Sequence, residues 1–277
     1  MEENKGVSLE DKCRAYQKRA DYYVNQDKYI LAHIDGRSFS KHIKNKFKKP
    51  FDDIFINAMN KTAQYLCANV QGAQVAYVQS DEISLLIKKR KENGEVFFGG
   101  RLCKMQSIIA GLATAKFNQY IAIRNIEEKL NKEEDCDLKE AIPLYQFDCK
   151  VWDVDNANDA WAWFLFRNID CVKNSKQQTA QTYIPHKRLL NKTADEQIEI
   201  AKEEKGVDWH SFSDDKKYGR LVVKEIVERF TMEGFNPGVT QYTRSVWNVK
   251  PLFDLTKEGS KDKFYEIVDC LKDGNKV

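Results

Sequence analysis

The stretch from Tyr29 to His42 reads YILAHIDGRSFSKH and constrains the fold more than any other part of the chain. Apolar and aromatic residues lead directly into Asp35 and Gly36, a pattern that predicts a buried strand ending in a tight turn. Asp-Gly is common in turns for conformational reasons alone, which is the simpler interpretation. A carboxylate at a strand end also suits a metal–phosphate site, because Asp35 can bind a cation and Gly36 lets the backbone approach phosphate oxygens.

A second stretch, Ala73 to Ile87, reads AQVAYVQSDEISLLI. Its two apolar runs flank Gln79-Ser80-Asp81-Glu82 and alternate as the strands of a β-hairpin do. If the first strand pairs with this hairpin, Asp35 and Asp81 meet at one edge of the sheet. Two carboxylates there could hold a pair of Mg²⁺ ions about 3.5–4 Å apart. The alternative is that Ser-Asp-Glu is only a polar turn.

The rest of the pattern alternates helices and strands. Helices are expected at 8–24, 50–70, 101–126, 159–183 and 193–204, and further strands at 144–154, 220–230 and 239–249. The order strand-helix-hairpin-helix-strand fits an α+β fold with an antiparallel sheet of the polymerase-palm (ferredoxin-like) type and helices on one face. We therefore predict a palm-like domain over residues 1–155 and a helical and β extension over residues 156–277.

Composition bounds the class of protein. The 277 residues are 42% hydrophobic and 12% aromatic, which is enough for a substantial core. Because 45 basic residues are nearly balanced by 42 acidic ones, any contact with nucleic acid must come from a local patch. Seven widely spaced cysteines without a CxxC pair predict reduced thiols, not a disulfide or zinc framework. With no signal peptide or membrane-length apolar run in view, we expect a soluble, cytoplasmic protein.

Five blocks, in order, resemble the signature blocks of the tRNA(His) guanylyltransferase family. They are HIDGRSFS from His33, FKKPFDD from Phe47, AYVQSDEISL from Ala76, FDCKVWDV from Phe147 and FRNIDCVKNSKQQTAQ from Phe166. Members of this family extend RNA in the 3′-to-5′ direction. The resemblance implies a nucleotidyltransferase that uses GTP and ATP, acts on the 5′ end of tRNA and forms a tetramer.

The resemblance also implies roles for individual residues. Asp35, Asp81 and Glu82 would be catalytic. Asp35 and Asp81, with the Gly36 carbonyl, would bind two Mg²⁺ ions, and Glu82 would be a further ligand or would support the others. The nucleotide triphosphate would be held by Asp35, Gly36, Arg37, Ser38, Phe39, Ser40, Ser80 and Asp81. The polar cluster at Lys173 and Asn174 is the candidate contact for RNA or a second triphosphate.

Three positions depart from the family pattern. Val78 stands where a Gly often precedes the hairpin tip, and His33 stands where an Arg often precedes the strand end. Val172 to Ser175 replaces the His-Ile-Asn-Asn of the eukaryotic tRNA(His) enzymes. This last difference resembles the "like protein" branch, whose members repair 5′-truncated tRNAs. It favours template-dependent 5′ repair over obligate addition of G to tRNA(His).

Other functions stay open at this stage. A palm-type nucleotide cyclase would use the same two carboxylates on a nucleoside triphosphate alone. A non-catalytic RNA-binding module would keep lysine-rich segments such as Lys41 to Lys49, which could contact RNA backbone or simply form a solvated face. The presence of both Asp35 and Asp81 argues against such a module.

Overall fold

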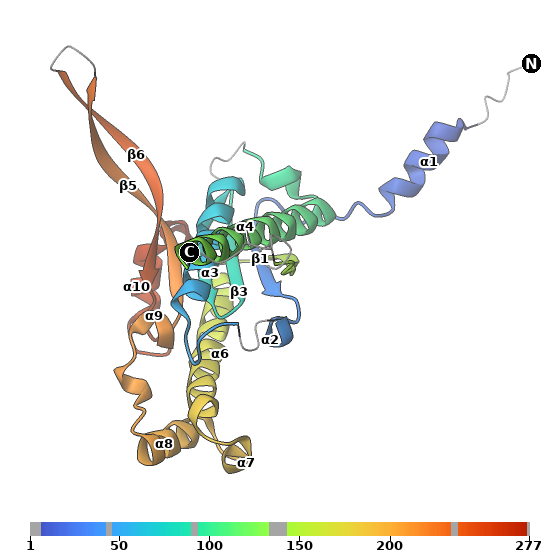
Figure 1. The fold of residues 1–277 in the computed structure, drawn as a ribbon. Coiled ribbons are helices and arrows are strands. Elements are labelled where there is room, and N and C mark those ends of the chain that lie inside the picture. The colour runs from blue at the N-terminus through green and yellow to red at the C-terminus, as the bar shows by residue number, and fades with distance from the viewer. Residues whose placement is uncertain (1–6, 43–45, 90–93, 133–142, 234–237, 276–277) are drawn as a thin grey trace, which may run out of the picture.

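The computed structural model describes residues 7–42, 46–89, 94–132, 143–233 and 238–275 (Figure 1). Within them, six strands form one antiparallel sheet of order β4-β1-β3-β2-β5-β6. The strands are β1 (Tyr29–Gly36), β2 (Ala73–Gln79), β3 (Glu82–Ile87), β4 (Phe147–Val154), β5 (Arg220–Glu233) and β6 (Gly238–Pro251). The predicted strand into Asp-Gly and the predicted hairpin are both confirmed, and β1 pairs directly with the hairpin strand β3.

Helices cover both faces of this sheet. Helices α3 (Asp53–Asn69) and α4 (Leu102–Asn131) bury one face, where β1 contributes Ile30, Ala32 and Ile34 to the core. Helices α6 (Ala157–Tyr183) and α10 (Ser260–Ile267) bury the other face, where β1 contributes Tyr29 and Leu31. Because successive strand residues point to opposite faces, a strand covered on both sides is apolar throughout. The predicted α+β class is confirmed, with α3 and α4 as the palm-type helices.

Capping residues fix where several helices begin and end. The Asp52 side chain accepts a hydrogen bond from the backbone N–H of Phe55 at 2.9 Å, so α3 begins at Asp53, three residues later than predicted. Helix α8 (Ala194–Lys205) has a capping box at Thr193 and ends at Gly206, whose φ is +67°. Helix α1 (Leu9–Lys18) stops six residues before the predicted end at residue 24. The chain that follows pairs with the segment before α4 through Tyr23.

The remaining elements are short and connect or flank the longer ones. They are α2 (Phe39–His42), η1 (Phe97–Gly100), α7 (His186–Leu189), η2 (Trp209–Ser211), α9 (Asp214–Lys217) and η3 (Asp269–Asn275). The far end of α6 forms a lobe with α7 and α8, and β5 and β6 continue beyond the sheet as a two-stranded ribbon (Figure 1). Only the start of β5 pairs with β2, yet this pairing joins the extension to the palm sheet. The domain division at residue 155 stays a prediction.

No helix in the described part of the chain is long and apolar enough to cross a membrane.

Candidate active site

Four carboxylates gather at one end of the sheet. At the end of β1, Asp35 lies opposite Glu82 on β3 and opposite Asp148 on β4. The backbone N–H of Gly36 donates to the carbonyl of Asp81, with an N–O distance of 3.1 Å, and this bond holds the β2–β3 turn beside the strand end. The structure therefore brings Asp35 and Asp81 together. Asp148, which has no predicted role in the site, joins them.

Burial and mutual repulsion both disfavour negative charge at this sheet end. The pKa of Asp81 is raised to about 6, chiefly by burial and also by the charges of Asp35 and Glu82, although a hydrogen bond from the Ser80 hydroxyl opposes the shift. Burial also raises the pKa of Asp35, and the charges of Glu82 and Asp148 raise it further. Carboxyl groups in such surroundings favour a bound cation, because it stabilises their ionised forms.

Glu82 differs from the two aspartates because a protein cation balances its charge. Arg167 on α6 forms an ion pair with Glu82 and a second one with Asp170 at 3.0 Å. The side-chain amide of Gln79 also donates to the Glu82 carboxylate at 2.8 Å. The contacts of Glu82 with Arg167 and Gln79 therefore fit a supporting role next to Asp35 better than they fit a metal ligand.

His33 is uncharged at this site. Burial and the nearby charge of Arg167 lower its pKa to about 4, so the imidazole is neutral at physiological pH. Its ring meets Trp163 edge to face at 5.3 Å, and its Nδ1 lies 3.3 Å from the Ser84 hydroxyl. The positive charge next to Glu82 therefore comes from α6, not from the β1 position where family members often carry an Arg.

The residues present fit a magnesium–phosphate site. No group of three or more His, Cys, Asp or Glu side chains within the described ranges is arranged to hold a metal ion. The predicted donor set is smaller and consists of the Asp35 and Asp81 carboxylates with the Gly36 carbonyl. Mg²⁺ prefers hard oxygen donors and usually takes only one or two carboxylates, with phosphates and water in its other positions. The raised pKa values at this sheet end agree with that chemistry.

Gly36 and Phe39 form the turn after β1. The Phe39 ring is 1% exposed and packs against aromatic residues of the core that include Phe117 and Tyr145. A Cβ at Gly36 would lie 2.4 Å from this ring, so only glycine lets the ring fold back under the strand end. Phe39 can therefore contribute only backbone groups to a nucleotide site. The resemblance implied that its side chain also holds the nucleotide triphosphate, and the buried position of the ring does not allow this.

Arg37 and Ser38 are the exposed part of the same turn. Arg37 donates through Nη1 to the side-chain oxygen of Gln146 at 3.0 Å, and Ser38 has a φ of +56°. Both line a small hollow next to Gln146 and Leu144. The side chain of Ser40 lies outside the described part of the structure.

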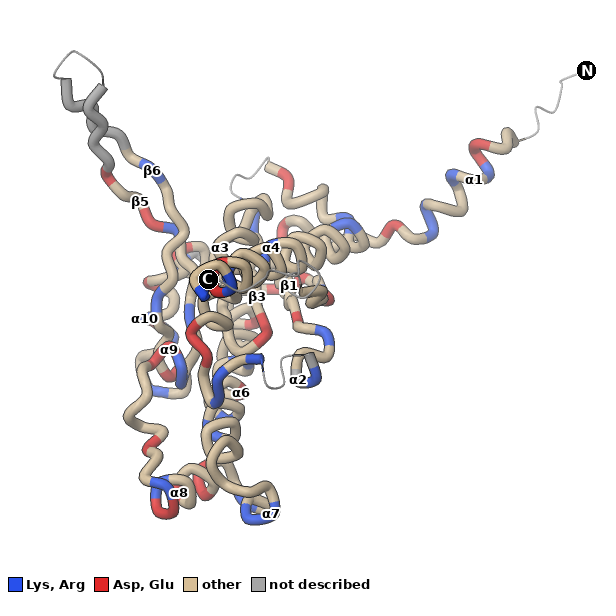
Figure 2. Tube along the Cα trace, viewed as in Figure 1, with Lys and Arg blue, Asp and Glu red and all other residues tan. Residues whose placement is uncertain are grey.

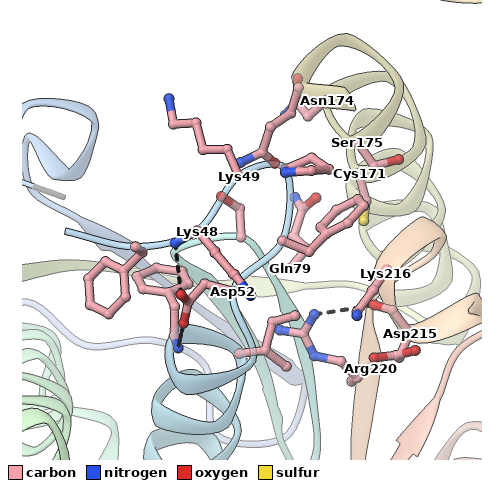
Figure 3. Close-up of a pocket in the computed structure, with 17 residues that line it drawn as sticks. Lys48, Lys49, Asp52, Gln79, Cys171, Asn174, Ser175, Asp215, Lys216 and Arg220 are labelled. Carbon is pink, nitrogen blue, oxygen red and sulfur yellow. Dashed lines mark hydrogen bonds between the residues drawn. The ribbon is translucent and has the colours of Figure 1, made fainter. Parts of the chain in front are cut away.

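A pocket adjoins the hairpin tip through Gln79 and Ser80 (Figure 3). Segments far apart in the sequence form it: residues 47–52 and the start of α3, the β2–β3 turn, the middle of α6, α9 and the first residue of β5. Its polar lining includes Gln79, Ser80, Asn174, Lys216 and Arg220. Ser80 and Asn174 were predicted site residues, whereas Lys216 and Arg220 were not. The available signal for Arg220 was its place in the stretch Tyr218 to Val223, YGRLVV, which also resembles the family.

Basic residues are spread over the molecule. Basic residues (blue) and acidic residues (red) are interspersed along α1 and in the α7–α8 lobe (Figure 2), as the balanced composition predicts. Lys173 is exposed on α6 and is not part of the pocket lining, whereas Lys48 and Lys49, at the end of the lysine-rich stretch, lie in that lining. Together with Lys216 and Arg220, these two residues form the basic part of the pocket lining next to the candidate site.

Comparisons with known proteins agree with this arrangement. Residues 10–155 match the family model described as tRNAHis guanylyltransferase (Thg1). A probable tRNA(His) guanylyltransferase of Dictyostelium discoideum is 28% identical over 84% of this chain and 80% of its own length.

Two solved structures are also similar. A bacterial tRNA(His) guanylyltransferase (Thg1)-like protein in complex with ATP has a TM-score of 0.75 and 27% identity, covering 94% of this chain and 99% of that one. A structure of such a bacterial Thg1-like protein with GTP has a TM-score of 0.69 and 25% identity, covering 93% and 96%. The chain is thus a nucleotidyltransferase that belongs to the tRNAHis guanylyltransferase family.

Proposed function

We propose that this protein adds nucleotides to the 5′ end of tRNA in the 3′-to-5′ direction, by Mg²⁺-dependent phosphoryl transfer, and so repairs 5′-truncated tRNAs on a template. The observation that carries the proposal is the convergence of Asp35 and Asp81 at one sheet end, next to a pocket. Membership of the family supports the reaction class. The ATP and GTP in the two similar bacterial structures support nucleoside triphosphates as substrates.

Asp35, Asp81 and the Gly36 carbonyl would hold the two Mg²⁺ ions. When bound, the ions would lower the pKa of the attacking 3′-hydroxyl and neutralise charge on the leaving pyrophosphate. The protein's own part is to fix the two carboxylates. The Gly36–Asp81 hydrogen bond sets the distance between strand end and turn, and the Arg167–Glu82 pair keeps a third negative charge from adding to theirs.

On a 5′-triphosphorylated tRNA the reaction balances without a further reactant, whereas a 5′ monophosphate must first be activated by ATP, with pyrophosphate released in that activation and AMP in the addition. The 3′-oxygen of the added nucleotide forms a bond to the 5′ phosphorus of the RNA, and its proton passes to solvent. On a triphosphorylated 5′ end, the bond from that phosphorus to pyrophosphate breaks. A nucleotide triphosphate on the Asp35–Asp81 side can place its base in the pocket, because Ser80 borders both.

The proposal of template-dependent repair rests on Val172 to Ser175, the four residues that stand where the eukaryotic tRNA(His) enzymes carry His-Ile-Asn-Asn. Of these four residues, Asn174 and Ser175 line the pocket. Ser175 is held in place by Trp209, whose indole N–H donates to the Ser175 hydroxyl at 3.1 Å. The departure from the eukaryotic tRNA(His) pattern therefore falls where a substrate would bind. From the same resemblance we propose a tetramer that acts in the cytoplasm, which sedimentation and cell fractionation would test.

The direct test is transfer of labelled nucleotide to a 5′-triphosphorylated tRNA that lacks its first residue, with Mg²⁺ and each nucleoside triphosphate in turn. We expect a product one nucleotide longer at the 5′ end. Conversion of a nucleoside triphosphate to its cyclic monophosphate without RNA would instead identify a cyclase. Failure to extend any RNA, in protein that binds tRNA normally, would refute the proposed reaction.

A further inference from the structure

Phe166 is an exposed aromatic residue on α6, beside the carboxylates of the candidate active site. The same helix carries two buried aromatic side chains, Trp161 and Phe164, which pack against Phe264 of α10. Phe166 lies on another side of α6 and is 54% exposed. A single exposed apolar residue is normal on a protein surface, so exposure alone assigns no role to this ring. Its neighbours and the charges around it are more informative.

Fixed side chains surround the Phe166 ring. Its centroid lies 5.8 Å from that of the Trp163 ring, and the guanidinium of Arg167 lies over it at 5.2 Å. Both neighbours are held in turn, because the Trp163 indole N–H donates to the Ser84 hydroxyl at 3.0 Å and Arg167 pairs with Glu82. A ligand that stacked on a ring supported in this way would cost little side-chain entropy.

The surface around Phe166 is continuous with the end of the sheet where the carboxylates gather. The Trp163 ring meets Phe166 on one side and His33 of β1 on the other, the latter at 5.3 Å. His33 and Asp35 are two residues apart on the strand, so both point to the α6 face and lie about 7 Å apart along it. An RNA whose 5′ end reacts at Asp35 therefore has its neighbouring nucleotides within reach of this surface.

Lysines flank the ring on two elements. Lys150 is exposed on β4 and lies directly opposite His33, and opposed residues of an antiparallel pair share a face of the sheet. Lys173 is exposed on α6, seven residues after Phe166 and so on the same side of the helix. Between them on that side lies Ile169, which is 49% exposed.

Two acidic residues share the area without cancelling these positive charges. Asp170 already pairs with Arg167 at 3.0 Å and accepts a hydrogen bond from the Asn174 side chain at the same distance. Asp148 lies opposite Asp35 at the sheet end, where a bound cation would balance it. An exposed aromatic ring between lysines is the combination that binds unpaired nucleotides, because the ring stacks on a base and the lysines contact phosphates.

We propose that Phe166 stacks on an unpaired base of the 3′ strand at the acceptor end of the tRNA, with Lys150 and Lys173 against the adjoining phosphates. The inference rests on the proposed function, because it takes the 5′ end of the RNA to react at Asp35 and Asp81. In a tRNA that lacks its first residue, the 3′ strand extends unpaired beyond the 5′ end, and aromatic side chains bind such unstacked bases. Phe166 is thus a positioning residue that holds the RNA end beside the reacting phosphorus.

The test measures binding of a 5′-triphosphorylated tRNA that lacks its first residue, by filter retention, and its extension at steady state. In Phe166→Ala the Kd and KM for tRNA are expected to rise about tenfold, while the KM for the nucleoside triphosphate stays unchanged. Phe166→Trp should keep the wild-type affinity, whereas Phe166→Leu, which is apolar but cannot stack, should not. Tyr183→Ala is the matched control, because Tyr183 is a 41% exposed aromatic residue at the far end of α6, and its Kd should not change.

A change in the RNA tests stacking without any variant. The unpaired nucleotides of the 3′ strand beyond the template position are replaced by abasic residues, which keep the phosphates and lose the bases. The wild-type protein should bind this RNA about tenfold more weakly than the intact one. Phe166→Ala should bind the two RNAs equally, since the ring that distinguishes them is absent.

Each outcome bears on a different claim. Equal wild-type affinity for intact and abasic RNA, or an unchanged Kd in folded Phe166→Ala, would overturn the role of Phe166 and leave nucleotide addition standing. If Phe166→Ala instead sedimented as a smaller species than the wild type, the ring would belong to a contact between copies of the chain, and the proposal would also fall. Wild-type protein that neither binds nor extends the tRNA would remove the proposed function as well.

Discussion

The pairing of Arg167 with Glu82 can be tested by removing one partner at a time. In Arg167→Met a side chain of similar length loses its charge, so both Glu82 and Asp170 lose their cation. Breaking a buried ion pair costs about 3–5 kcal/mol. Because the side chains of Arg167 and Glu82 are 10% and 21% exposed, we expect a loss near the lower limit, about 3 kcal/mol in the free energy of unfolding.

A double-mutant cycle isolates the pair. In a Glu82→Gln background a neutral amide replaces the carboxylate, so no negative charge at position 82 needs a counter-charge. Arg167→Met should then lower the free energy of unfolding by only about 1 kcal/mol, which gives a coupling between the two residues of about 2 kcal/mol. Urea unfolding followed by tryptophan fluorescence measures each corner. The exposed pair of Arg188 and Glu204 is the control, with an expected coupling below about 1 kcal/mol. Equal costs of Arg167→Met in both backgrounds would refute the view that Arg167 balances Glu82.

Three further predictions follow from the same structure. Asp35→Asn and Asp81→Asn should each reduce nucleotide addition by about 10³-fold or more while tRNA binding in a filter assay is retained, and near wild-type activity in either would refute the metal assignment. Glu82→Gln should lose much less activity than either aspartate variant in the same assay, and an equal loss would contradict its supporting role. Gly219→Ala should destabilise the protein by about 3 kcal/mol, because φ is +82° and a Cβ would lie 2.7 Å from both the Tyr77 ring and the Val78 carbonyl. Gly206→Ala, at φ +67° in open space, should cost only about 1 kcal/mol, and equal melting temperatures for these two variants would contradict the difference.

The local parts of the site could be predicted from sequence. Alternating apolar residues and the Asp-Gly and Ser-Asp-Glu breaks identified β1 and the hairpin, and antiparallel pairing then placed Asp35 near Asp81. Turn chemistry was less informative about Phe39. Phe39 follows Asp35 by four positions in a polar turn, where side chains are usually exposed. Because Gly36 has no Cβ, the Phe39 ring enters the core instead.

Contacts between distant segments could not be predicted in this way. Arg167 lies 85 positions from Glu82, and no periodicity or motif spacing links the two. Arg220 and Asn60, which meet at the pocket floor, are 160 positions apart. Helix α10 was missed because the last residues are charged, although Phe264 and Tyr265 bury against Trp161. Tertiary packing, not local propensity, determines these features.

We propose that the protein extends the 5′ end of tRNA under the direction of a template. Four tRNAs that lack the first residue, and differ only in the base opposite the vacant position, would be incubated with Mg²⁺ and all four nucleoside triphosphates. Sequencing of the extended 5′ ends then gives the added nucleotide for each. We expect the complementary nucleotide to be added in every case. Addition of G whatever base lies opposite would contradict templated repair and identify a guanylyltransferase in the narrow sense.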